Sequence, residues 1–148
     1  MRCGNEVWSG ANDMSVFYCI PSDTVVMSEA FADMVTHVEP EGDRRVGVYD
    51  VVVSHELAHA VQRATAPTKS KLEDGESIML KELQADCLSG QSMVDMAPGR
   101  IDGAYDFFNF VVPVIDFTHG TQAQRAEAFT MGLLGEGCTV SDILSITL

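Results

Sequence analysis

Five consecutive residues, His55-Glu56-Leu57-Ala58-His59, carry the strongest chemical signal in this chain of 148 residues. Two histidines four positions apart on a helix lie on the same face, so both imidazoles can reach a single metal ion. Glu56 stands beside the first histidine, where its carboxylate can hydrogen-bond a metal-bound water rather than the metal. This pattern is typical of zinc peptidases, in which one helical turn supplies two ligands and a general base. Taken alone, it also fits a helix with two partly buried histidines and a solvated glutamate.

A catalytic zinc site needs a third protein ligand and an open fourth position. The segment Lys81-Glu82-Leu83-Gln84-Ala85-Asp86 places two carboxylates four positions apart on one helical face. Glu82 follows His59 by 23 positions, which allows one loop and an antiparallel return. We therefore expect Glu82 to bind zinc and Asp86 to accept a hydrogen bond from the far ring nitrogen of a ligand histidine. Without the first motif, both carboxylates would be interpreted as ordinary surface groups.

Two long helices must position these residues. The pattern from Val46 to Ala64 is helical and strongly apolar, and it contains both histidines. A second helix is expected from near Gly75 to Met96, because Leu80, Leu83 and Cys87 form one apolar stripe. Pro98-Gly99 then ends it. The metal site should lie between these two helices.

Shorter elements are expected on either side. Val16–Cys19 and Thr24–Met27 are β-prone runs around the turn residues Pro21-Ser22-Asp23, which predicts a hairpin. A helix should follow from Ser28 to Val38, with Ser28 as its N-cap. After the two long helices, residues 102–112 should form a third helix. Thr121 to Gln124 has the form of a capping box that opens a last helix, which ends near Leu134 before Gly135.

Composition limits the classes of function. There are 9 Lys and Arg residues against 22 Asp and Glu, which gives a formal charge of −13. A chain this acidic repels phosphate backbones and anionic lipids, so we expect no nucleic-acid binding and no docking on a membrane surface. No apolar run approaches the roughly 18–20 residues of a membrane span, and residues 1–10 do not have the pattern of a signal peptide. A hydrophobic content of 46% indicates one globular domain, residues 1–148.

The pair of motifs, H-E-x-x-H followed by E-x-x-x-D, resembles the gluzincin branch of zinc peptidases. The chain is more closely similar to the bacterial neutral zinc metallopeptidase family. The similarity spans about residues 16–138 and is carried by four segments, Phe17-Tyr18-Cys19, His55-Glu56-x-x-His59-Ala60-Val61-Gln62, Glu82-Leu83-Gln84-Ala85-Asp86-Cys87 and His119-Gly120-Thr121-x-x-Gln124-Arg125. Ala58 is a departure, because the family usually has Gly between the two histidines.

This resemblance implies an α+β, mainly helical, zincin-like fold. An N-terminal β-hairpin or small sheet would pack on the active-site helix, beside a second, ligand-bearing helix. The implied function is that of a zinc metallopeptidase, an endopeptidase rather than an exopeptidase, acting on a peptide or protein substrate. One Zn²⁺ per chain would be held by His55, His59 and Glu82. Glu56 would be the general base, and Asp86 would accept a hydrogen bond from a ligand histidine.

The resemblance also gives His119 a candidate role. In zincins, a His or Tyr beyond the metal ligands often donates a hydrogen bond to the oxyanion of the reaction. Without the resemblance, His119 would be interpreted as a turn or capping residue. Tyr105 and Tyr49 are weaker candidates for the same role. Arg125 could pair with an acidic site residue, but the pattern favours a surface cation.

The four cysteines, Cys3, Cys19, Cys87 and Cys138, include no C-x-x-C pair. They could be buried free thiols or two disulfides, for which three pairings exist. Because members of the similar family are often exported, the resemblance favours disulfides, with Cys87–Cys138 and Cys3–Cys19 as the expected pairs. It also favours an extracytoplasmic location, secreted, periplasmic or at the cell surface, over the cytoplasm.

Other functions fit the same motifs. The chain could be an inactive zinc-binding relative that serves as an interaction module. It could also be a zinc hydrolase that acts on amides other than peptides. The remaining alternative is a metal-free helical domain in which the motif is accidental.

Overall fold

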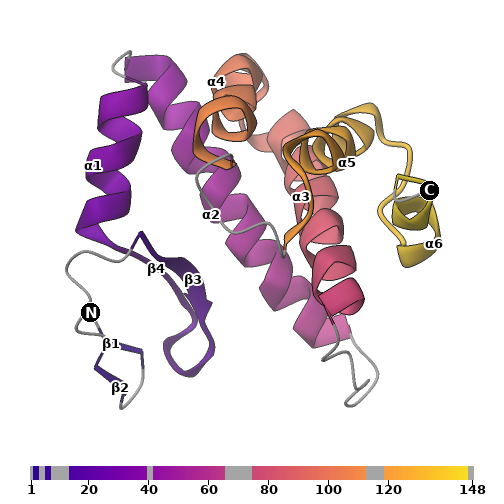
Figure 1. Ribbon diagram of the computed structural model, residues 1–148, viewed down its shortest axis with the longest axis horizontal. Helices are drawn as coiled ribbons and strands as arrows, with labels where there is room; N and C mark the ends of the chain where they lie inside the picture. The colour runs from indigo at the N-terminus through magenta and orange to yellow at the C-terminus, as the bar shows by residue number, and fades with distance from the viewer. Residues whose placement is uncertain are drawn as a thin grey trace.

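Two long antiparallel helices form the centre of the molecule (Figure 1). The computed structural model describes residues 2–3, 6–7, 14–39, 42–65, 75–112 and 119–146. The central pair is α2 (Gly42–Thr65) and α3 (Gly75–Met96). Near the middle of α2, Ser54 Oγ lies 2.5 Å from Ser89 Oγ in the second half of α3, whereas Gln62, near the end of α2, reaches Lys81 in the first half of α3. The two motif-bearing helices therefore lie side by side in opposite directions. α2 begins one turn before the predicted Val46.

A hairpin and a short helix stand on one side of this pair. Strands β3 (Val16–Cys19) and β4 (Thr24–Met27) are antiparallel, and Phe17 lies opposite Val26. Between them, η1 (Ile20–Ser22) leads into Asp23, which adopts the left-handed conformation with φ 54°. Helix α1 (Glu29–Val38) begins as predicted, because the Ser28 hydroxyl accepts a hydrogen bond from the Phe31 N–H. Strands β1 (Arg2–Cys3) and β2 (Glu6–Val7), which were not predicted, form a separate antiparallel pair.

The C-terminal elements pack on both helices of the central pair. η2 (Pro98–Arg100) leads into α4 (Ile101–Asp106), which widens into one π-helical turn, η3 (Phe107–Val111). The single helix predicted over 102–112 is thus divided in two. Helix α5 (Gln122–Leu134) has the predicted capping box at Thr121 and ends at Gly135 in the left-handed conformation. A last helix, α6 (Val140–Leu144), is capped by Thr139.

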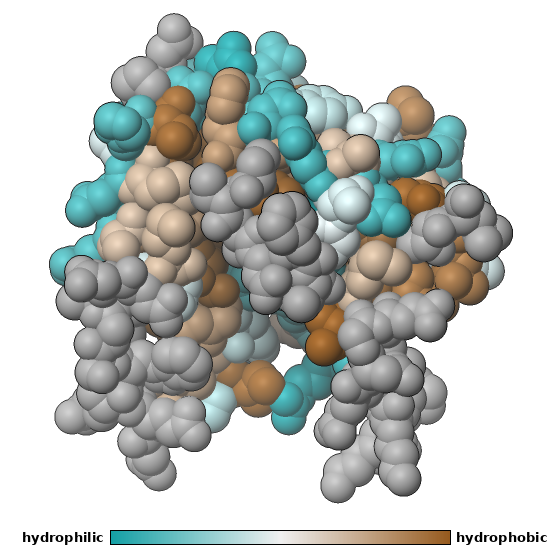
Figure 2. Space-filling view, in the orientation of Figure 1, coloured by the Kyte–Doolittle hydropathy of each residue, from teal (hydrophilic) through white to brown (hydrophobic). Residues whose placement is uncertain are grey.

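The hydrophobic core lies where α2 meets α1, α3, α4, η3 and α5. Its largest fully buried side chains include Phe108, Phe129, Met93, Val48 and Val51. A second buried cluster joins α3 to α5 and α6 around Leu83 and Ile143. Figure 2 shows hydrophobic residues gathered between α1 and α2, below a hydrophilic end near α4.

Helices α3 and α5 approach very closely at two glycines. A Cβ on Gly90 would overlap the Phe129 carbonyl oxygen, and a Cβ on Gly132 would overlap the Cys87 carbonyl oxygen. Only glycine therefore permits this crossing. The crossing brings the first turn of α5 over the middle of α3, where the acidic motif lies.

Two disulfides tie these elements together, with the expected pairing. Cys3–Cys19 joins β1 to the hairpin, and Cys87–Cys138 joins α3 to the segment before α6.

The described chain is mainly helical with small antiparallel sheets, in agreement with the predicted α+β class. None of its described helices has the length and apolarity to span a membrane.

Candidate metal centre

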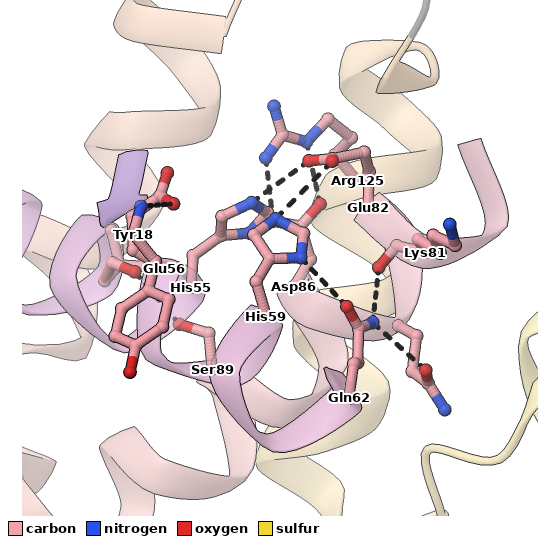
Figure 3. Close-up of polar contacts among 12 residues, drawn as sticks. Tyr18, His55, Glu56, His59, Gln62, Lys81, Glu82, Asp86, Ser89 and Arg125 are labelled. Atoms are coloured by element: carbon pink, nitrogen blue, oxygen red, sulfur yellow. Dashed lines mark hydrogen bonds and ion pairs between the residues drawn. The ribbon is translucent and has the colours of Figure 1, made fainter. Parts of the chain in front are cut away.

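Three donor side chains meet between α2 and α3 (Figure 3). His55 Nε2 lies 3.1 Å from Glu82 Oε2, and His59 Nε2 lies 3.4 Å from Glu82 Oε1. One ligand atom from each of the three residues lies within 4.8 Å of the other two, and zinc binds such atoms at about 2.0–2.1 Å. Nitrogen and carboxylate oxygen are also donors that zinc prefers. The three residues thus form a group that could hold a metal ion.

A buried carboxylate makes a hydrogen bond with the second ring nitrogen of His55. Its Nδ1 lies 2.8 Å from Asp86 Oδ1, which is the contact expected from the spacing of the acidic motif. Asp86 is fully buried and also accepts two hydrogen bonds from Arg125, at 2.7 and 2.9 Å. Burial raises the pKa of Asp86, but Arg125 and His55 outweigh this effect and hold the pKa below its usual value. Asp86 is therefore ionised and can accept the Nδ1 proton of His55, which directs Nε2 towards Glu82.

The prediction that Arg125 is a surface cation is wrong. Its side chain is almost completely buried, and the guanidinium lies over the Phe107 ring, 5.6 Å from its centroid. The reason is the close crossing of α3 and α5, which places Arg125 against Asp86, 39 positions earlier in the chain. No local pattern around Arg125 indicates this partner.

Interactions between opposite charges dominate the cluster. Burial lowers the pKa of His55, but Asp86 and Glu82 reverse this effect and raise it to about 9. Burial raises the pKa of Glu82, yet its hydrogen bonds to His55 and His59 bring it well below the usual value. A proton on His55 therefore supplies the positive charge that a metal cation would supply between the same groups.

Glu56 lies beside the three donors and outside their set. Its Oε2 accepts a hydrogen bond of 3.0 Å from the backbone N–H of Tyr18 in β3. Burial raises the pKa of Glu56, whereas the two neighbouring histidines, His55 and His59, lower it, and the net shift is upward. The hairpin thus fixes one carboxylate oxygen. The contact with Tyr18 was not predicted.

Two cavities border the centre. One, of about 340 Å³, lies next to His55, and the other, of about 440 Å³, lies next to His59. Both are also lined by Glu56, Glu82 and His119, and by β3. The first has mainly apolar walls, which include Met14, Val16, Phe17, Phe31, Val52 and Phe107. Cavity space therefore adjoins the centre at both His55 and His59.

The structure separates the three candidates for an oxyanion donor. His119 borders both cavities together with Glu56 and Glu82. Tyr49 lies elsewhere, with its hydroxyl 3.2 Å from the Ala32 carbonyl oxygen. Tyr105 pairs with Thr130 at 2.8 Å and packs on Phe129. Of the three, only His119 lines the cavities at the donors.

Comparisons with protein-family models, with curated proteins and with solved structures find no significant match for this chain. The resemblance noted from the motifs therefore stays a prediction.

Proposed function

We propose that this protein is a zinc-dependent metallopeptidase. The observation that carries the proposal is the convergence of one ligand atom each from His55, His59 and Glu82, all within 4.8 Å of one another, which are donor types that zinc prefers. Glu56 lies next to these donors, and its Oε2 accepts a hydrogen bond from the backbone N–H of Tyr18. The similarity of the motifs to bacterial neutral zinc metallopeptidases supports the same function.

Residues of the chain would position the general base, transfer the proton and stabilise the carbonyl oxygen of the substrate. When bound, zinc supplies a Lewis acid that polarises a carbonyl group and allows water to lose a proton near neutral pH. The N–H of Tyr18 holds Glu56 Oε2, so Oε1 is the oxygen that takes the proton from water and returns it to the leaving amine. His119, at the border of both cavities, would donate a hydrogen bond to the carbonyl oxygen of the substrate.

An extended peptide is the substrate that suits the surroundings of the site. Backbone groups of alternate residues in a strand point to the same side. The Tyr18 N–H points towards α2 and away from β4. Val16 lies two residues earlier in β3, so its backbone N–H and C=O point to the same side, along the edge of β3 that does not pair with β4. A peptide could pair with this edge by strand addition. Cavities beside both His55 and His59 would accept chain on either side of the cleaved bond, which supports an endopeptidase.

An extracytoplasmic location is part of the proposal. The two disulfides are compatible with it, since such bonds persist mainly in oxidising compartments.

The test is Glu56→Gln, compared with Glu127→Gln, a matched change at an exposed position on α5. We expect Glu56→Gln to retain zinc and lose turnover of casein or a quenched peptide by at least about 100-fold. The control should retain both. Unchanged turnover in Glu56→Gln would remove Glu56 from its role. If the wild-type protein binds zinc but cleaves no peptide in a broad panel, the peptidase proposal fails.

A further inference from the structure

Gln62 links a ligand histidine to the opposite helix. It lies on α2, one turn after His59, and its Oε1 is 2.8 Å from His59 Nδ1. Its Nε2 donates two hydrogen bonds to α3, one of 2.7 Å to the Lys81 carbonyl oxygen and one of 3.0 Å to Gln84 Oε1 (Figure 3). The side chain of Gln62 thus has three polar partners.

These partners determine which way the amide of Gln62 points. A backbone carbonyl oxygen can only accept, so the nitrogen of the amide must face Lys81. Gln84 is oriented by the same logic, because its Nε2 donates to the Cys138 carbonyl oxygen at 2.9 Å and its Oε1 therefore faces Gln62. The carbonyl oxygens of Lys81 and Cys138 can only accept hydrogen bonds. Together they determine which end of each amide, Gln62 and Gln84, is the nitrogen and which is the oxygen.

The orientation of the amide determines the tautomer of His59. Since Gln62 presents an oxygen that can only accept, His59 Nδ1 must carry the hydrogen. The lone pair of the neutral ring then lies on Nε2, which faces Glu82 at 3.4 Å. Asp86 imposes the same arrangement on His55. The two ligands are therefore prepared by different groups, a carboxylate for His55 and a neutral amide for His59.

We propose that Gln62 is a positioning residue of the metal centre, which selects the metal-binding tautomer of His59 and fixes its ring. This role rests on the proposed function, since it presumes that the three donors bind zinc. Loss of a group that hydrogen-bonds a ligand histidine typically lowers metal affinity about 10–100-fold.

The experiment measures zinc affinity by chelator competition in four proteins: wild type, Gln62→Met, Gln62→Glu and Gln84→Met. Methionine retains the bulk of Gln62 and removes all three hydrogen bonds. Glutamate retains an acceptor for His59 but cannot donate to Lys81 or Gln84. Gln84→Met is the matched control, because it alters the same interhelical network without touching His59. Thermal unfolding of each metal-free protein and absorption spectra with Co²⁺ accompany the titrations.

We expect Gln62→Met to lower zinc affinity about 10–100-fold and to change the Co²⁺ spectrum, while Gln62→Glu and Gln84→Met stay within about threefold of wild type. Equal affinity of Gln62→Met and wild type would overturn the role. So would an equal loss in Gln62→Met and Gln62→Glu, because the amide would then serve only to join the helices. Should Gln62→Met fail to fold, Gln62→Asn, whose shorter side chain withdraws the oxygen from His59, takes its place with the same expected loss. A wild-type protein that binds no zinc would remove the proposed function together with this role.

Discussion

Arg125 binds Asp86 through two parallel hydrogen bonds, from Nε to Oδ2 at 2.7 Å and from Nη2 to Oδ1 at 2.9 Å. Oδ1 also lies 2.8 Å from Nδ1 of His55. A cation on α5 thus reaches a candidate ligand on α2 through a carboxylate on α3. The ring of His55 is oriented by contacts among three helices that meet only in the folded chain.

The first prediction concerns the stability of this pair. Arg125→Leu should lower the free energy of unfolding by about 3–5 kcal/mol, because it leaves the buried Asp86 carboxylate without its cation. Arg125→Lys should lose less, although lysine cannot form the two parallel bonds. Arg100→Leu is the control: Arg100 pairs with Asp50 at 2.6 Å, but the two side chains are 42% and 32% exposed. Its loss should be at most about 1 kcal/mol. Urea unfolding that gives equal losses for Arg125→Leu and Arg100→Leu would contradict the prediction.

The second prediction concerns pH. The pKa of His55 in the metal-free protein, about 9, is above its ordinary value of 6.5. Protonated His55 therefore stabilises the metal-free fold fully below pH 6.5, and this contribution is lost as the pH rises through about 9. Zinc must displace that proton, so zinc affinity should rise between pH 7 and pH 9.

Calorimetry checks this linkage. Zinc titrations at pH 7 in buffers with different ionisation enthalpies should give heats that depend on the buffer, since binding releases protons. Heats that are the same in every buffer would show that no proton leaves the site.

The third prediction concerns the crossing of α3 and α5. Gly132→Ala should lower the free energy of unfolding by at least about 3 kcal/mol, the upper end of the usual cost of overpacking, because the new methyl group would overlap the Cys87 carbonyl oxygen. It should also weaken zinc binding, since α5 carries Arg125. Gly99→Ala, where a Cβ has nothing within 4 Å, is the control and should leave both properties near wild type. The measurements are thermal unfolding and zinc affinity, and a variant as stable as Gly99→Ala would exclude a tight crossing.

Local signals were sufficient to predict most helices and the donor residues. Ser28, Thr121 and Gly135 act at helix ends as their types indicate. The meeting of His55, His59 and Glu82 was predicted from two spacings. Four-residue spacing places the two histidines on one face of a helix, and the 23 positions from His59 to Glu82 allow a loop and an antiparallel return.

The other contacts of the site depend on how the elements pack. Arg125 meets Asp86 only because two glycines allow α5 to cross α3 closely. The bond from Tyr18 to Glu56 requires the hairpin to lie against α2. Gln62 is an intermediate case: its position three residues after His59 places it on the same face, but its partners on α3 could not be predicted.

The central claim is that His55, His59 and Glu82 together hold one metal ion. Metal content by mass spectrometry tests it most directly, for the wild-type protein, Glu82→Ala and Asp95→Ala, whose exposed carboxylate lies on the same helix. We predict about one zinc ion per chain in the wild-type protein and in Asp95→Ala, and a loss of most of the zinc in Glu82→Ala. No zinc in the wild-type protein after zinc is supplied, or equal zinc in the wild-type protein and Glu82→Ala, would contradict the claim.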